Sequence, residues 1–482
     1  MDTDLLITSV NADGDGVATF EGRTVTVPGT IPGERVVAAL QRSREGGLTG
    51  ALTRILVASP HRVTPGCRHF GPCGGCTWQH IGYPEQLRLK QRLLQGLLDA
   101  ALGAHAPSVR LTLGTPTLDG GTPWGYRDKV HFAFGPGGRS LVMGHYRRAS
   151  RTVLPVEECP VHAEEGNRFA FVVRDALARA RIRGTTADGE DGIARHVVVR
   201  VSEGTGERLG TLVVTENVKA LRRVTADVQA GIAPGDPGAS QPRVGFHLNL
   251  HDRPGSFLFG RDTRRLFGLG EVREQVAGAS YLVSPTAFFQ TNVRAAQVLV
   301  REVLDALSDA RYRRILDLYA GVGLFALPLA REGRMVTAVD ESREAMAGAA
   351  AALRVNRISE PSCRLIASRV EDAMDRLAGR RSARDYGSPA GPDEGSWDAV
   401  VLDPPRQGCP PHVLEWIVHT LRPARIVYVS CNPDALARDL AGVSGAGYIF
   451  ERVQPIDMFP HTAHVETVVV LKRIEPRSGG IC

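Results

Sequence analysis

The first sixty residues alternate apolar and polar positions in short runs that glycine-rich turns separate. The turns read NADGDG, EG, PGTIPG and REGG, and period-two alternation between such breakers predicts β-strands. We expect strands at Asp4–Val10, Val17–Phe20, Thr24–Val27, Arg35–Leu40 and Gly50–Val57. Short, closely spaced strands are typical of a small closed barrel of the OB type, which commonly binds oligonucleotides. The pattern predicts such a barrel over residues 1–62.

Residues 63–284 read as a second, mostly β-rich domain that starts with a cysteine-rich turn region. An amphipathic helix is predicted over residues 83–102, because its leucines recur at helical spacing on one face. This helix has two candidate partners, its sequence neighbours and the C-terminal domain. Strand-like runs such as VHFAFG, HVVVRVS and VGFHLNL follow between residues 126 and 284.

From residue 285 the pattern alternates strands with helices as far as residue 476. The runs RRILDLYA, MVTAVD, SWDAVVLD and RIVYVS are strand-like, and LFALPLAREG and SREAMAGAAAALRVN between them are helical. Repeated strand–helix order predicts an α/β class domain with a parallel, doubly wound, Rossmann-like sheet. A chain of 482 residues has room for this domain beside the two preceding ones.

Polar residues follow the predicted strands of this last domain, at the edge where open α/β sheets bind ligands. Gly321 and Gly323 form a tight turn after the first strand, and glycine lets the backbone approach a ligand closely. Asp340 ends the next strand, where a carboxylate can accept hydrogen bonds from ribose hydroxyls, as in nicotinamide and S-adenosylmethionine enzymes. Asp403 ends a later strand and is stiffened by two prolines. A tight turn without a ligand and an aspartate that only caps its turn are the alternatives.

Cys431 follows the strand RIVYVS and precedes Asn432 and Pro433, which stop that strand. A cysteine exposed at a strand end, beside a turn, is where a nucleophile is held. The alternative is a buried, inert thiol. Together with the glycine turn and DPPRQG, the motif SCNP suggests a methyltransferase that attacks its substrate with a cysteine.

Composition narrows the class of partner and compartment. The net charge of +6 and pI near 9.0, mostly from arginine, favour a polyanion such as RNA, although a general compositional bias gives the same numbers. No run of 18 apolar residues is present and the N-terminus lacks a basic signal region, so we expect a cytoplasmic protein without a membrane span. Cys67, Cys73, Cys76 and Cys159 are then candidate ligands of a [4Fe-4S] cluster or of zinc.

Several separated motifs resemble the RNA (uracil-5-)-methyltransferase family over essentially the whole chain. They are SCNP, DPPR, SPTAFFQTN and FPHTAHVETVVVL, and the stretch GDGVATFEGRTVTVPGTIPGERV resembles an RNA-binding TRAM domain. The resemblance implies that Cys431 adds to carbon 6 of uracil and that Glu466 removes the carbon 5 proton, with His461 and His464 as other candidate proton carriers. It also implies that four residues line an S-adenosyl-L-methionine pocket, namely Gln290, Tyr319, Asp340 and Asp403, and that Phe288 stacks on a base or belongs to the core.

The cysteine spacing, CGGC included, resembles the iron–sulfur branch of that family, which implies a [4Fe-4S] cluster in preference to zinc. The cluster cysteines and the TRAM-like barrel resemble the 23S rRNA branch, so the resemblance implies 23S rRNA as the substrate, with tRNA as the alternative. Two alternative hypotheses for the function are a cytosine-5-methyltransferase and a non-catalytic RNA-binding assembly factor. No obligate protein partner is indicated.

Overall fold

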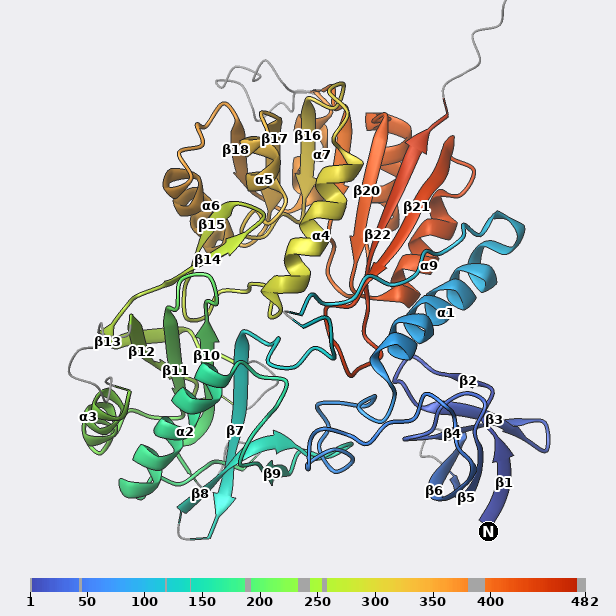
Figure 1. Cartoon of the computed structure of the whole chain (residues 1–482). Helices are drawn as coiled ribbons and strands as arrows, with labels where there is room; N and C mark the ends of the chain where they lie inside the picture. Colours follow the sequence, from blue (N-terminus) through green and yellow to red (C-terminus); the bar gives the residue numbers. More distant parts are fainter. Residues whose placement is uncertain are drawn as a thin grey trace, which may run out of the picture.

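The computed structural model describes residues 2–42, 46–117, 119–138, 140–186, 192–232, 243–253, 258–379 and 395–474. Three large sheets and one two-stranded sheet organise these residues. The N-terminal sheet and the central sheet lie side by side, and the C-terminal α/β sheet stands above both (Figure 1). Among these residues, no helix has the length and the apolar character that a membrane crossing needs.

The N-terminal sheet has six strands in the order β1-β5-β6-β4-β3-β2 and curls around buried Leu5, Val25 and Val36. The expected strand Asp4–Val10 is divided in two, because the backbone of Ile7 bonds to Gly33 and Glu34 instead of continuing the ladder. The strands are β1 (Asp2–Leu6), β2 (Ser9–Val10), β3 (Gly16–Phe20), β4 (Arg23–Val27), β5 (Arg35–Arg42) and β6 (Leu48–Val57).

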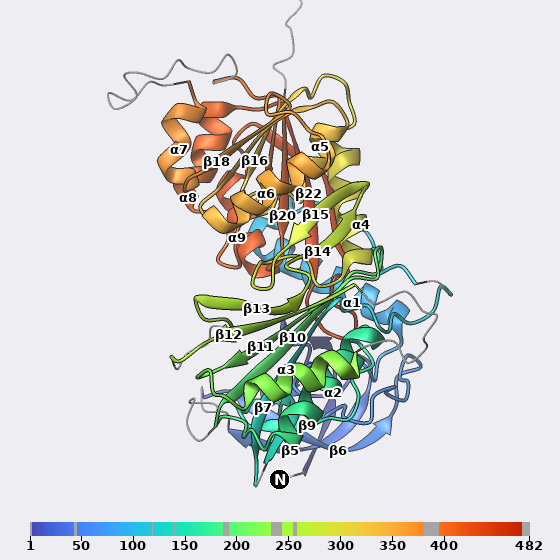
Figure 2. The ribbon, with the colours of Figure 1, turned by 90° about the vertical axis from the view of Figure 1, so that its left-hand side faces the viewer.

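The central sheet has seven strands in the order β13-β12-β11-β10-β7-β8-β9. Helices α2 (Glu164–Arg179) and α3 (Leu221–Gly231) cover one of its faces (Figure 2) and share its apolar core. The strands are β7 (Lys129–Gly137), β8 (Ser140–Tyr146), β9 (Val153–Pro155), β10 (Ala194–Val201), β11 (Arg208–Val214), β12 (Val244–Leu250) and β13 (Asp262–Gly268).

The C-terminal sheet confirms the predicted Rossmann-like α/β class. Its order is β18-β17-β16-β19-β20-β22-β21, and β22 runs antiparallel to both of its neighbours while the other pairs are parallel. The strands are β16 (Arg314–Leu318), β17 (Met335–Asp340), β18 (Cys363–Ala367), β19 (Ala399–Leu402), β20 (Arg425–Ser430), β21 (Tyr448–Ile456) and β22 (Glu466–Arg473).

Helices cover both faces of this sheet. One core contains α4 (Val293–Ala306), α5 (Ala326–Arg331) and α6 (Arg343–Val355). The opposite core contains α7 (Val370–Leu377), α8 (Pro411–Glu415), the π-helical turn Trp416–Leu421 and α9 (Pro433–Val443). The hairpin β14 (Val272–Val276) and β15 (Ala279–Val283) packs into the first core, so we propose that the domain division expected at residue 285 lies before this hairpin.

Helix α1 (Tyr83–Leu102) packs beside α9 of the C-terminal domain (Figure 1), and its Leu89 also joins a small core with Val10 and Ile31 of the barrel. Pro84 sits in its first turn and Gly103 ends it, which explains why its limits agree with the sequence pattern. Leu94 and Leu98 are fully buried in the core under β16, β19 and β20. The N-terminal half of the chain thereby supplies part of the C-terminal domain's packing.

Candidate active site and metal centre

A cavity of about 830 Å³ opens at the edge where the parallel strands of the C-terminal sheet end. Its lining includes Gln290, Tyr319, Asp340 and Asp403, the four residues that the sequence placed in a cofactor pocket. Tyr319, Asp340 and Asp403 meet because β16, β17 and β19 run in the same direction and finish side by side, whereas Gln290 comes from the segment between β15 and α4. Phe288 also lines the cavity and is 75% exposed, so it belongs to the mouth of the cavity and not to the core.

Asp340 holds the glycine turn in place. Its Oδ2 accepts a hydrogen bond of 2.8 Å from the amide of Gly321, and its Oδ1 accepts one of 2.8 Å from the amide of Ser342. Gly321 and Gly323 have φ of 55° and 82°, a region that favours glycine. A Cβ at Gly323 would lie 2.3 Å from Leu327 Cδ1, so the turn also needs a small residue for packing.

Cys431 and Glu466 do not line this cavity but lie beside Asp403 at the same sheet edge. β20 ends at Ser430, which pairs with Thr467 of β22, so the next residues of the two strands, Cys431 and Glu466, follow in register. Asn432 then caps α9 by accepting from two amides, and its side-chain amide donates to the carbonyl of Arg406 at 2.9 Å. The antiparallel register brings the predicted nucleophile and base together.

Burial and the repulsion between neighbouring negative charges keep the Cys431 thiol and the Glu466 carboxyl protonated. Burial, followed by the charges of Glu466 and Asp403, raises the pKa of the Cys431 thiol to about 11. Burial and the charge of Asp403 raise the pKa of Glu466 well above its usual range, and burial raises the pKa of Asp403 to about 7. The charge of Arg406 lowers the pKa of both Cys431 and Glu466. The free site is therefore a neutral thiol beside a neutral carboxyl.

The two candidate histidines differ in their environment. His461 is 1% exposed, stacks on Trp124, and pairs with the carbonyl of Pro123 and with Gln86. Its ring is fully engaged, and burial lowers its pKa to about 4, so it has a packing role. His464 is exposed beside Phe459.

Sequence reasoning gave no role to two residues of this region. Arg406 stands in the motif DPPRQG, and its position directly after Asp403, Pro404 and Pro405 was a usable signal. Cys409 lines the cavity and lies 3.8 Å from the hydroxyl of Tyr319, but nothing in its sequence context distinguishes it from a core thiol.

Cys67, Cys73, Cys76 and Cys159 line one small cavity in the central domain. Burial raises the pKa of Cys76 to about 11 and of Cys159 to about 12. In the part of the chain that the structure describes, no three of these sulfurs lie within 4.8 Å of one another. Four thiolates can hold either a structural zinc ion or a [4Fe-4S] cluster.

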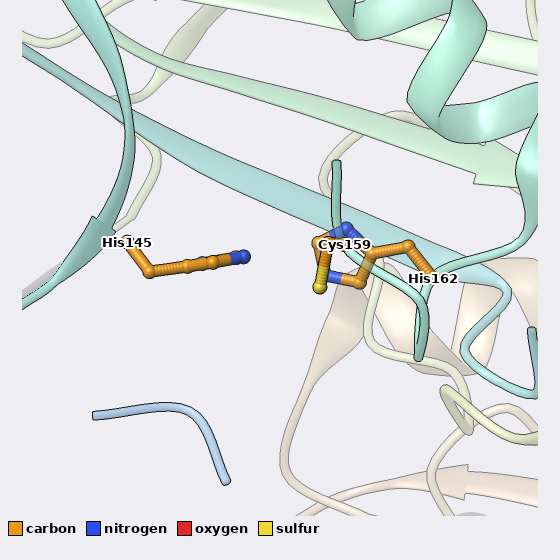
Figure 3. A group of neighbouring side chains, drawn as sticks. All are labelled: His145, Cys159 and His162. Atoms are coloured by element: carbon orange, nitrogen blue, oxygen red, sulfur yellow. The ribbon is translucent and has the colours of Figure 1, made fainter. Parts of the chain in front are cut away.

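Two histidines lie close to one of these cysteines. His145, Cys159 and His162 place their ligand atoms within 4.8 Å of one another (Figure 3). Nδ1 of His162 faces the side chain of Asn167 at 3.3 Å, and Nε2 of His145 is buried without a partner. The spacing Cys-x-x-His between Cys159 and His162 was a signal for the second histidine, whereas His145 lies in β8 and no motif links it to the cysteines.

Comparison with known proteins agrees with this geometry. The family described as tRNA (Uracil-5-)-methyltransferase matches residues 271–474, and the TRAM domain matches residues 3–53. A protein of Gloeobacter violaceus named as an uncharacterized RNA methyltransferase is 35% identical over 97% of this chain and 95% of its own length. A protein of Halalkalibacterium halodurans with the same description is 30% identical over 97% and 96%.

Among solved structures, the Pyrococcus abyssi tRNA (uracil-54, C5)-methyltransferase in complex with S-adenosyl-L-homocysteine superposes with a TM-score of 0.73. It is 25% identical and covers 97% of this chain and 99% of that one. The family resemblance predicted from the motifs is thereby confirmed. The chain belongs to the tRNA (uracil-5-)-methyltransferase family and is an S-adenosylmethionine-dependent RNA (uracil-5-)-methyltransferase with an N-terminal TRAM domain.

Proposed function

We propose that this enzyme methylates carbon 5 of a uridine in RNA through a covalent bond between Cys431 and carbon 6. The meeting of Cys431, Asp403 and Glu466 beside the cavity carries the proposal. Carbon 5 of uracil is a weak nucleophile, and thiolate addition at carbon 6 converts it into an enolate carbon. S-adenosylmethionine, when bound, supplies the methyl group.

The residues have separate tasks in this mechanism. The Cys431 thiolate forms the bond to carbon 6, and the displaced electron pair moves to the uracil carbonyl. After carbon 5 is methylated, the Glu466 carboxylate takes the carbon 5 proton, and the electrons of that bond expel the Cys431 sulfur. Both groups must lose a proton in the bound complex, and the positive charge of Arg406 favours that loss. Once ionised, a carboxylate with a raised pKa is a stronger base.

The cavity has the features that S-adenosylmethionine needs. Asp340 stands at the end of β17 beside the glycine turn, where a carboxylate accepts from ribose hydroxyls. Gln290, Tyr319 and Asp403 supply polar groups to the same space. We assign the cofactor to this cavity, with Phe288 at its mouth in a position to stack on the target base.

We propose 23S rRNA as the substrate, on the basis of the cysteine centre and the barrel together. The tRNA alternative has its own support, because the Pyrococcus abyssi tRNA enzyme covers 97% of this chain, barrel included. Methylation assays on 23S rRNA and tRNA transcripts, followed by mass mapping of 5-methyluridine, distinguish them. A product confined to tRNA overturns the choice of 23S rRNA and leaves the chemistry unchanged.

We also propose that Cys67, Cys73, Cys76 and Cys159 hold a [4Fe-4S] cluster. Purified protein should be brown and contain iron, and Cys73→Ser should remove both properties. Zinc without iron in the purified protein rejects the cluster.

RNA that contains 5-fluorouridine tests the covalent step, since fluorine at carbon 5 blocks proton removal and stalls the adduct. The parent protein should form a complex that survives denaturing gels, and Cys431→Ala should not, while it still binds S-adenosylhomocysteine. Cys363→Ala is the matched control, because this buried cysteine begins β18 at the opposite end of the sheet. An adduct in Cys431→Ala, or none in the parent, refutes the mechanism.

A further inference from the structure

The segment Asp457–Val465 leads directly into Glu466, the first residue of β22, and so bears on the position of that carboxyl in addition to the pairing of β22 with its neighbours. It leaves β21 after Ile456 and returns as β22 at Glu466. A loop of this length has many conformations unless other parts of the molecule hold it. Several of its contacts come from helix α1, which the sequence places in the N-terminal half of the chain, and others come from residues 77–78, from residues 113–126 and from Asn292.

Lys90 of α1 binds this loop at three points. Its Nζ donates to Asp457 Oδ1 at 2.5 Å, to the carbonyl of His464 at 2.7 Å and to the carbonyl of Phe459 at 3.2 Å. An ammonium group has three donors, so each of them is used. Asp457 and His464 lie near the two ends of the loop, and His464 is two residues from Glu466.

Two further residues of α1 act on the same loop. The carboxamide of Gln86 accepts from the amide of His461 at 2.8 Å, and the hydroxyl of Tyr83 accepts from the amide of Thr115. Thr115 in turn donates to the carbonyl of Asp457 at 2.6 Å. Tyr83, Gln86 and Lys90 recur at helical spacing, so one face of α1 presents all of them to the loop.

The ion pair between Lys90 and Asp457 costs desolvation free energy, because both charges are buried. Lys90 and Asp457 are both fully buried, and Asp457 Oδ2 has no partner. Burying a charged pair often contributes no more stability than apolar side chains of the same volume. The pair does provide directional hydrogen bonds from Lys90 to the loop. An apolar residue at position 90 would fill the same volume without bonding the two ends of the loop.

We propose that Lys90 is a positioning residue for Glu466, acting by fastening both ends of the loop Asp457–Val465. The inference rests on the proposed role of Glu466 as the base. Without the three bonds, the thiol of Cys431 still adds to uracil, because β20 and α9 place it. Removal of the carbon 5 proton slows, because the carboxylate is no longer held at reacting distance.

The test follows the covalent complex in a single turnover with RNA that carries a natural uridine. Lys90→Met removes the charge and keeps the length of the side chain, and the double variant Lys90→Met, Asp457→Asn also removes the unpaired carboxylate. We expect both to form the methylated adduct near the parent rate and to resolve it about 100-fold more slowly, the size of effect that a misplacement of about 1 Å can have. Binding of S-adenosylhomocysteine should be unchanged. Glu466→Gln should also accumulate the adduct.

Arg92→Met is the matched control, since Arg92 pairs with Glu85 on the same helix, is 58% exposed and does not bond to the loop. It should behave as the parent. A Lys90 variant that binds S-adenosylhomocysteine and resolves the adduct at the parent rate overturns the proposal, and so does loss of S-adenosylhomocysteine binding in both Lys90 variants, which would mean that the pair supports the fold. If Glu466→Gln itself resolves the adduct normally, the proposed base is wrong instead.

Discussion

Asp340 offers a direct test of how the glycine turn binds its ligand. Both of its oxygens already accept backbone hydrogen bonds of 2.8 Å, from Gly321 and from Ser342. In Asp340→Asn one oxygen becomes an NH₂ group, which faces an amide N–H where it cannot accept. A lost hydrogen bond to a charged group costs about 1.5–3 kcal/mol. When the whole of this free energy is lost from binding, the affinity for S-adenosylhomocysteine falls by about 10- to 150-fold.

Isothermal titration calorimetry with S-adenosylhomocysteine measures this change, and thermal unfolding of the same samples shows whether the variant is folded. Glu332→Gln serves as the control, because Glu332 is exposed at the end of α5 and does not line the cavity. A folded Asp340→Asn variant whose affinity changes by less than about 3-fold would refute the reasoning that this carboxylate organises the turn for binding.

Three further predictions follow from the packing and the charges. Arg406→Gln should move the pH profile of adduct formation to higher pH, because Arg406 lowers the pKa of Cys431 and Glu466; an unmoved profile rejects this role. Leu94→Ala should cost about 2.7–5 kcal/mol and lower the urea midpoint of the C-terminal domain, whereas exposed Asp99→Ala should not; equal midpoints would contradict the packing of α1. Burial raises the pKa of Glu274 to about 7, so its contribution to stability is present below its ordinary pKa and is lost as pH rises through 7. Glu274→Gln should therefore flatten the fall of the melting temperature between about pH 5 and pH 8, and an equally steep fall would refute the assignment.

Local patterns were sufficient for much of the architecture. Helix α1 begins and ends where proline, glycine and leucine spacing predict, because these signals act within one or two turns. The alternation of strands and helices after residue 285 predicted the Rossmann-like sheet for the same reason. The division of the expected strand Asp4–Val10 was not predicted, since it results from bonds between Ile7 and the distant residues Gly33 and Glu34.

In the candidate site, too, local sequence patterns did not predict the contacts between residues that are distant in the chain. Motif context singled out Cys431, Asp403 and Glu466, but only the register of β20 against β22 brings Cys431 and Glu466 together. The histidines of the loop could not be separated by sequence, and burial against Trp124 assigns His461 to packing. His145 lies near Cys159 only in the folded chain, because the pairing of β8 in the central sheet brings it there.

The sequence by itself determined the class of each domain and the chemical types at the strand ends, because periodicity, turn residues and short motifs are local properties of the chain. The tertiary structure decided which distant segments touch. A helical face of leucines predicts burial but not its partner, so nothing local to residues 83–102 specified α9 or the loop before Glu466 as the surface that α1 covers. That choice depends on complementary packing and on one buried ion pair between Lys90 and Asp457, which form only when the two halves of the chain meet.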